Sequence, residues 1–169
     1  MANTNVFTGS DATLTLAIED SPEGQEANAV IEFYNLSPVG RATNVEVRVE
    51  TDIDVFHEIG KRHPRAVRAG NIYISGKIGR AYINGALLRL LLGKGALVER
   101  TAEPFPPPSF NILLDLKDPA TPTTSSTLTV HNVKFENWAY TLPEDDFVLE
   151  CVTFKALFIT VEEKEAAST

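Results

Sequence analysis

The chain has 169 residues, of which 43% are hydrophobic and 22% charged, a composition typical of a folded domain and not of a disordered chain. Fifteen lysine and arginine residues against 23 aspartate and glutamate residues give a net charge of −8, which disfavours nucleic-acid binding. The sequence has no apolar run of the roughly 18 residues that a membrane-spanning helix needs, and its start does not resemble a secretory signal, so we expect synthesis in, and initial retention in, a cytoplasm.

Alternating apolar and polar residues predict strands in the first part of the chain. Residues 11–18 alternate leucine or isoleucine with smaller side chains, and residues 44–51 alternate valine with charged side chains. The second pattern predicts a strand with one apolar and one polar face, as in an antiparallel sheet. Between these strands, turn-forming residues predict a loop at 20–25, and residues 30–34 predict another strand.

The middle of the chain begins with a polar segment. Residues 54–70 contain histidines, cations and chain-breaking residues, so we expect a long loop with a functional role. A strand is predicted at 71–75, and Gly76 and Gly79 after it are expected to serve a tight turn or a bulge.

A leucine-rich helix is predicted next, from residue 80 or 81 to Leu92, with Gly93 as its left-handed cap. Its side chains are apolar almost all round, so it has to be buried on more than one side. One small sheet covers only one side. We therefore expect another subunit to cover the remainder.

The last part of the chain is rich in proline and in strands. Residues 103–108 predict a stiff polyproline segment, and residues 119–126 predict a solvated loop. Residues 162–169 are expected to form a flexible tail. Further strands are predicted over residues 110–116, 127–135 and 150–161.

The predicted elements, about seven strands and one helix, indicate a mainly β fold. We expect two packed antiparallel sheets, arranged as a sandwich or barrel, with one flanking α-helix. A chain of this length fits one domain, so we assign residues 1–169 to a single domain with a core over residues 10–162.

Candidate catalytic and metal-binding residues each have a structural explanation that we favour. Asp52 and Asp54 flank Ile53 on one strand face, where paired carboxylates are able to hold Mg²⁺ or act as acid and base. The turn Glu144-Asp145-Asp146 is acidic but lacks the spacing of a calcium loop. His57, His63 and His131, even with Glu58, are more typical of solvated histidines than of a metal site. These candidates are interpreted as surface residues.

The remaining motifs are also interpreted structurally. Residues 70–78 contain two glycines and a lysine but lack the spacing of a phosphate-binding loop. Cys151 is expected to be a buried apolar residue, because it lies in an apolar strand without a nearby cation. Phe135 and Trp138 are expected to be core aromatics. No catalytic, cofactor-binding or metal-binding residue is assigned.

The basic cluster at residues 61–68 is the one feature that favours an anionic partner. DNA is one candidate for that partner. In a chain with a net charge of −8, an acidic patch on a neighbouring copy of the same chain is the interpretation that we favour.

In the order of its elements the chain resembles the tail tube proteins of long-tailed phages, above all contractile-tailed ones, and of related contractile injection systems. The resemblance rests on the strand at 44–51 leading into residues 56–64, on residues 70–78 followed by the leucine-rich helix, and on residues 128–138 followed by an acidic turn and residues 150–156. It extends over residues 10–162. Segments 106–108 and 121–127 depart from it.

The resemblance implies a structural protein of a virion tail, neither enzyme nor cofactor-dependent, that assembles in the cytoplasm of a bacterial host. Six subunits would join their inner sheets into a ring, and rings would stack into a tube that conducts DNA without binding it specifically. Tail sheath, tape measure and baseplate proteins are implied partners, and no membrane is implied. Six copies would carry about −48 per ring, some of it lining the channel.

Alternatives remain. One is the inner tube of a non-phage contractile injection system, which would conduct an effector protein. Another is a monomeric β-barrel that binds a small ligand and is plugged by the helix. A third is an enzyme that uses Asp52, Asp54, His57 and Glu58.

Overall fold

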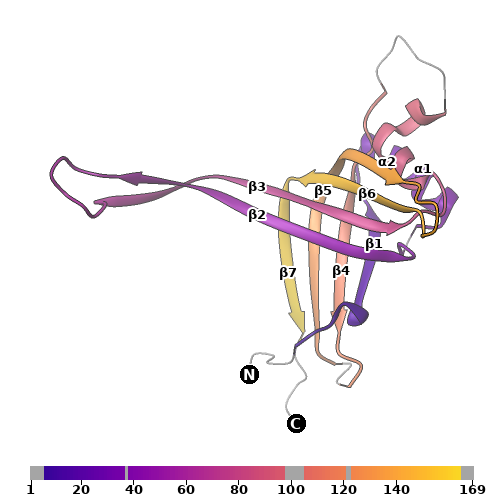
Figure 1. Ribbon diagram of the computed structural model, residues 1–169, viewed down its shortest axis with the longest axis horizontal. Coiled ribbons are helices and arrows are strands. Elements are labelled where there is room, and N and C mark those ends of the chain that lie inside the picture. The colour runs from indigo at the N-terminus through magenta and orange to yellow at the C-terminus, as the bar shows by residue number, and fades with distance from the viewer. Residues whose placement is uncertain (1–5, 37, 98–104, 121–122, 165–169) are drawn as a thin grey trace.

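The backbone forms an antiparallel sheet of seven strands that folds over on itself into two layers (Figure 1). The computed structural model describes residues 6–36, 38–97, 105–120 and 123–164. Its helices are α1 (Pro22–Tyr34) and α2 (Ala86–Leu92), with short 3-10 helices η1 (Gly9–Asp11) and η2 (Gly93–Ala96). Its strands are β1 (Ala12–Ile18), β2 (Ala42–Phe56), β3 (Ala66–Ala81), β4 (Phe110–Lys117), β5 (Ser125–Thr141), β6 (Leu149–Ala156) and β7 (Phe158–Lys164). The predicted fold class is confirmed, with two α-helices in place of one.

Strand β5 belongs to both layers. Its first half pairs with β4 on one side and β7 on the other, and β1 extends this first layer beyond β4. Its second half pairs with β6, and β3 and then β2 continue the second layer. The strands of the two layers cross steeply (Figure 1), as in orthogonal sheet packing. Ile112 and Val130 of the first layer and Ile78 and Phe154 of the second meet in one apolar core.

The chain turns from one layer to the other at Asn132. This residue has a φ of 53°, a left-handed conformation that asparagine tolerates better than most residues. Its backbone N–H donates a hydrogen bond to Oδ1 of Asn111 at 3.0 Å, and its side-chain Nδ2 donates to Glu19 at 2.7 Å. The turn is therefore held by side chains from β4 and from the segment after β1.

The strand predicted over residues 150–161 is divided at Leu157 into β6 and β7, so that part of the prediction was wrong. The N–H of Leu157 donates to the carbonyl oxygen of His131 at 3.0 Å, next to the turn of β5. Both halves keep the alternation of a strand, which does not reveal that the chain changes layers. β7 continues to Lys164, and the rest of the predicted tail lies outside the described residues.

Helix α1 replaces the predicted loop at 20–25 and the predicted strand at 30–34. Oγ of Ser21 accepts the N–H of Gly24 at 2.9 Å, and Pro22 occupies the first turn, which are the features of a helix start. The β-branched residues in its last turns suggested a strand, but packing of one helix face outweighs that local preference. The buried face of α1 consists of Gly24, Ala27, Val30 and Ile31.

Helix α2 is shorter than predicted, because residues 80 and 81 belong to β3. The helix begins at Ala86, whose N–H donates to Oδ1 of Asn84 at 3.2 Å. Gly93 is the C-cap, as predicted, and its φ of 60° is positive, but its ψ of −133° lies outside the left-handed helical region that was predicted. α2 contacts α1 and β5, and Leu87 and Leu90 are buried in this chain alone. Much of the cover that was expected from another subunit is therefore supplied by α1.

Gly76 and Gly79 lie inside β3 and not at a turn, because β3 is much longer than predicted. Gly79 pairs with Asn44 beside a register shift in β2, which agrees with the alternative prediction of a bulge. A Cβ at Gly76 would lie 2.2 Å from the carbonyl oxygen of Glu46 and 2.5 Å from the ring of Phe154. Glycine at this position therefore permits the close approach of that ring to the backbone of β3.

The prediction that Cys151 is buried was wrong, and its side chain is exposed. Its neighbours Glu150 and Val152 are buried, so the alternation of β6 places the cysteine on the opposite face. Phe135 is buried in the core, as predicted, while Trp138 is half-buried at its border.

A buried ion pair joins β3 to β6. Arg80 and Glu150 are each 1% exposed, and the Nε of Arg80 donates to Oε1 of Glu150. The second carboxylate oxygen accepts the indole N–H of Trp138 at 2.8 Å, and Nη2 of Arg80 donates to Oδ1 of Asn84 at 3.2 Å. Both carboxylate oxygens are thus bonded, which offsets part of the cost of removing two charges from water.

Removing one partner of this pair is expected to be costly. We expect Glu150→Ala to lower the free energy of unfolding by about 3–5 kcal/mol, because Arg80 would keep a buried charge without its counter-ion. Urea unfolding followed by the fluorescence of Trp138 measures the change. The double variant Arg80→Met/Glu150→Leu should recover most of the loss, and a single-variant loss under about 1 kcal/mol, as for a surface pair, would contradict this account.

Candidate assembly surfaces

The hairpin of β2 and β3 projects beyond the rest of the sheet (Figure 1). Pairing of β3 with β6 stops at Ile74, so residues 49–73, which we call the arm, continue as a two-stranded ribbon in the described part of the chain. The loop predicted at 54–70 is reduced to a tip of residues 57–65. At about 3.3 Å per residue, the paired part of the arm is roughly 25 Å long.

One face of the arm is apolar. Val49 lies opposite Ile74 and Val55 opposite Val67, and cross-strand partners share a face. Toward the body this face enters the core, where Ile74 is 7% exposed. Along the arm it is uncovered, with side chains that are 49–65% exposed. These residues, Val49, Ile53, Val55, Val67 and Ile72, form what we call the arm stripe.

The arm stripe indicates a surface that another surface covers. Contiguous exposed apolar residues rimmed by polar ones are typical of interaction sites. The predicted division of this strand into an apolar and a polar face is confirmed near the body, but farther out the apolar face has no core beneath it.

The opposite face of the second layer carries paired charges. Arg48 lies 3.0 Å from Glu46 and 3.7 Å from Glu50, and Nζ of Lys77 lies 3.3 Å from Glu46. Because these side chains are well exposed, each pair contributes little to stability. Their effect is to neutralise the cations on this face locally.

Both outer strands of the second layer have an open edge. Among the described residues, β2 pairs with β3 alone and the second half of β5 pairs with β6. All pairings in this layer are antiparallel, so β2 and the second half of β5 run in opposite directions. Such edges present backbone N–H and C=O groups that are able to pair with another chain.

The tip of the arm combines an apolar residue with cations. Ile59 is fully exposed, and Lys61 and Arg62 beside it are exposed as well. Arg65 forms an ion pair with Glu58 at 3.1 Å. The basic cluster found in the sequence thus lies at the end of the arm and the start of β3.

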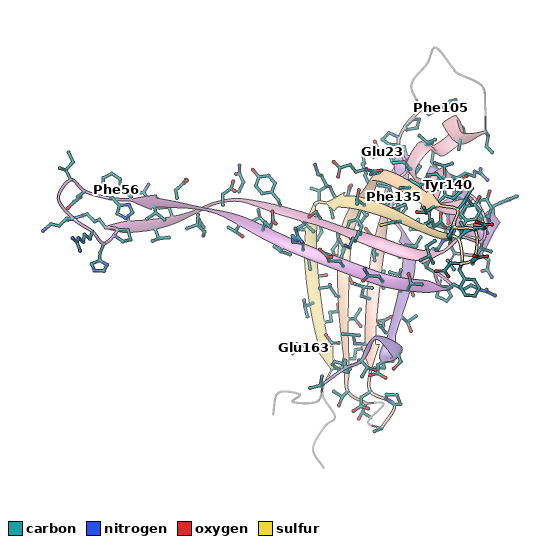
Figure 2. The ribbon with its side chains drawn as sticks, viewed as in Figure 1. Glu23, Phe56, Phe105, Phe135, Tyr140 and Glu163 are labelled. Carbon is teal, nitrogen blue, oxygen red and sulfur yellow. The ribbon has the colours of Figure 1, made fainter. Side chains whose placement is uncertain are left out.

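An apolar patch lies at the other end of the hairpin. The rings of Tyr82 and Tyr140 stack with centroids 5.5 Å apart, and the N–H of Tyr82 donates to the carbonyl oxygen of Val148 at 2.8 Å. The turn at 144–146 is exposed beside them. Figure 2 shows Phe56 of β2 and Tyr140 of β5 at opposite ends of the molecule. What we call the end patch consists of the exposed residues Tyr82, Ile83, Tyr140, Leu142 and Phe147.

The structure does not gather the predicted catalytic candidates into a cleft. Asp52 and Asp54 share one face of β2, as predicted, but both are exposed on the arm. His57 is exposed at the tip, and Glu58 there is paired with Arg65. An enzyme site made of these residues would stand in open solvent.

His131 is far from the other two histidines. It lies in β5, where its Nε2 forms a hydrogen bond with Oγ1 of Thr160 at 2.9 Å and its ring stacks on Phe158. Within the described ranges, no three histidine, cysteine, aspartate or glutamate side chains are placed to hold a metal ion. Neither described helix has the length and apolar character to cross a membrane.

Sequence analysis missed the arm and the end patch. The signal for the arm was present, because the alternation of residues 44–51 continues to Phe56 and resumes from Ala66. The charged residues between them were interpreted as a long loop instead of a hairpin tip. The end patch has no local signal, since Tyr82 and Tyr140 are brought together only by the pairing of β3, β6 and β5.

No protein-family model matches the sequence, and no curated protein matches it. Solved structures do share its fold. The tube terminating cap of the anti-feeding prophage aligns with a TM-score of 0.61 at 11% identity, over 96% of this chain and 95% of that one. The sheath/tube terminator of the extracellular contractile injection system PVC aligns with a TM-score of 0.60 at 11% identity, over 95% and 99%.

A phage tube has the same fold. The SPP1 tail tube protein aligns with a TM-score of 0.59 at 11% identity, over 94% of this chain and 80% of that one. Likeness at such low identity concerns the fold. The chain therefore has the fold of tail tube and tube-terminator proteins.

Proposed function

We propose that this chain is a structural subunit of a phage tail tube, or of the inner tube of a related contractile injection system. It acts by assembling with copies of itself into hexameric rings that stack into a hollow conduit. The observation that carries the proposal is the tube fold together with two open, oppositely directed strand edges on one layer.

The two open edges support closure into a ring. The second half of β5 and β2 run antiparallel, so β5 of one copy pairs with β2 of the next without reversing either strand. Closure of this kind removes the exposed edges that otherwise favour uncontrolled aggregation. The ring count of six comes from the resemblance of the whole chain to tail tube proteins.

The charged face of the second layer suits a channel wall. Its cations Arg48, Lys77 and Lys155 are each paired with a carboxylate of the same face, the last with Glu136 at 3.1 Å. Cations neutralised in this way bind phosphate weakly, because an arriving DNA strand has to displace the carboxylate. In the proposed tube, local pairing of charges, more than the net charge of about −48 for six copies, would let DNA pass without specific binding.

Helices α1 and α2 gather at one end of the two layers, where α1 contacts β1 and β4 and α2 contacts β5, and they suit the outer wall. In a contractile particle that wall docks a sheath, and tape measure and baseplate proteins complete the tail. Structures of similar chains come from a sheath-tube complex and from a baseplate. The proposal places the protein in the virion tail after assembly in the host cytoplasm.

The alternatives receive less support. A ligand-binding barrel needs an interior cavity, and the space between the layers is filled by buried side chains such as Phe110, Val130 and Phe154. In this proposal the chain has no catalytic role. Phage tube and non-phage injection tube remain joint candidates, because similar structures come from both.

Electron microscopy tests the proposal directly. We expect the purified chain, alone or on a tail-derived nucleus, to form rings with a central channel, single or stacked, in negative stain. Ile53→Asp should weaken assembly at least about tenfold while leaving the monomer folded, because it charges the arm stripe without opening the core.

The matched control is Asp52→Asn, one residue away on the opposite face, which should leave assembly unchanged. A chain that stays monomeric at high concentration with every nucleus supplied overturns the proposed function. Equal effects of the two substitutions would show that the arm stripe is not a contact surface.

Hydrogen exchange tests the open edges. In the free subunit, the outward amides of β2 should exchange rapidly, because they have no partner strand in the described chain. In the assembled tube they should be protected at least about tenfold more strongly. Unchanged exchange of β2, measured by mass spectrometry of its peptides, would contradict pairing between β2 and a neighbouring β5.

A further inference from the structure

We infer that the tip of the arm docks on the end patch of a second copy of this chain, with Ile59 against the aromatic rings and the tip cations beside the acidic turn. This inference rests on the proposed self-assembly and names the two surfaces that meet when one ring stacks on the next. Each surface is incomplete in the isolated subunit.

The apolar parts of the two surfaces match in kind. Ile59 is fully exposed in the loop between β2 and β3 that ends the arm, so it contributes nothing to the core of the isolated subunit. The end patch offers a broad target, with Phe147 exposed by 82% and Leu142 by 69%. Exposed tyrosines such as those of the end patch are frequent interface anchors, and an aliphatic side chain buried among them supplies the apolar centre of a contact.

The charges of the two surfaces are complementary. The tip carries three cations, Lys61, Arg62 and Arg65, and one carboxylate, Glu58, for a net +2. The other end of the hairpin carries three exposed carboxylates at residues 144–146 and one arginine, Arg41, for a net −2. Opposite net charges of equal size steer the two surfaces together and fix their register.

The geometry makes this contact head-to-tail. The tip and the end patch lie at the two ends of one hairpin (Figure 2), so the tip of a subunit cannot cover the end patch of the same subunit. A contact between two different surfaces propagates from copy to copy and does not close a dimer. That property is what a stack of rings requires.

A rival acidic site lies on β7. Glu162 and Glu163 are exposed next to Val161, but Lys164 follows them and reduces the local charge. Figure 2 shows Glu163 at the end of the first layer, away from the line of the hairpin. The end patch is in line with the arm and is therefore the better acceptor.

A charge exchange tests the contact. We expect Lys61→Glu/Arg62→Glu and, separately, Glu144→Lys/Asp145→Lys to reduce stacking about tenfold, measured as the fraction of protein that sediments as tubes. Combining all four substitutions should restore most of the stacking, because the tip is then negative and the turn positive, so the two surfaces attract each other again. All four positions are exposed, so the subunits should keep their unfolding transition.

The control is Glu162→Lys/Glu163→Lys, which changes charge equally at the rival site and should leave stacking intact. Rings that form and stack regardless of the tip and turn charges would overturn the inference and leave the proposed function standing. Failure of the unmodified chain to form any ring would overturn the proposed function itself. If Glu162→Lys/Glu163→Lys restored the stacking of the Lys61→Glu/Arg62→Glu chain, the acceptor would lie on β7. That result would also overturn the inference.

Cross-linking gives a second readout. In a Cys151→Ser background, Ile59→Cys combined with Phe147→Cys should yield chains linked in series under mild oxidation. Ile59→Cys combined with Val161→Cys is the matched control and should remain largely unlinked. Equal linking of the two double-cysteine variants would contradict docking on the end patch.

Discussion

At Asn132 the longest strand, β5, leaves the first layer and enters the second, and the position of every later strand depends on that turn. A left-handed φ is needed there, and the hydrogen bonds to Asn111 and Glu19 hold it. Because the turn is steep, β6, β3 and β2 cross the first layer instead of extending it. The hairpin of β2 and β3 consequently passes over the core and out beyond it. A straight β5 would have placed the same hairpin beside the first layer, without a projecting arm.

The arm follows from this crossing and from an unbroken alternation. With Thr51 as the exception, residues of β2 keep one face apolar from the core to Val55, although the core ends near Val49. Each stripe side chain that is half exposed forgoes roughly 1 kcal/mol of burial in the isolated subunit. The proposed assembly would supply the cover that these side chains lack in the isolated subunit. The paired charges on the reverse face fit the same division, with one side for contact and one side for solvent.

Local pattern predicted the strands and little of their arrangement. β1, β4 and the first parts of β2 and β5 were predicted because each keeps a period of two over a buried face. Helix α1 was missed, although Ser21, Pro22 and the spacing of Ala27 and Ile31 are helix signals, because its β-branched residues were weighed as a strand. The division of the last strand at Leu157 and the end patch depend on contacts between distant segments, and no local pattern records those. Cys151 shows the limit of composition, since its residue type is usually buried but the alternation of β6 turns it outward.

A head-to-tail contact also gives an assembly two different ends. In a stack joined by tip and end patch, one terminal ring presents free tips and the other presents free end patches. A protein that stops growth at one end needs to match only one of these surfaces and to lack the other. The chain shares its fold both with a tube protein and with tube-terminating proteins, so the fold alone does not distinguish a subunit that repeats from one that stops growth. This chain carries both surfaces, with complementary charge, which is the requirement for a subunit that repeats.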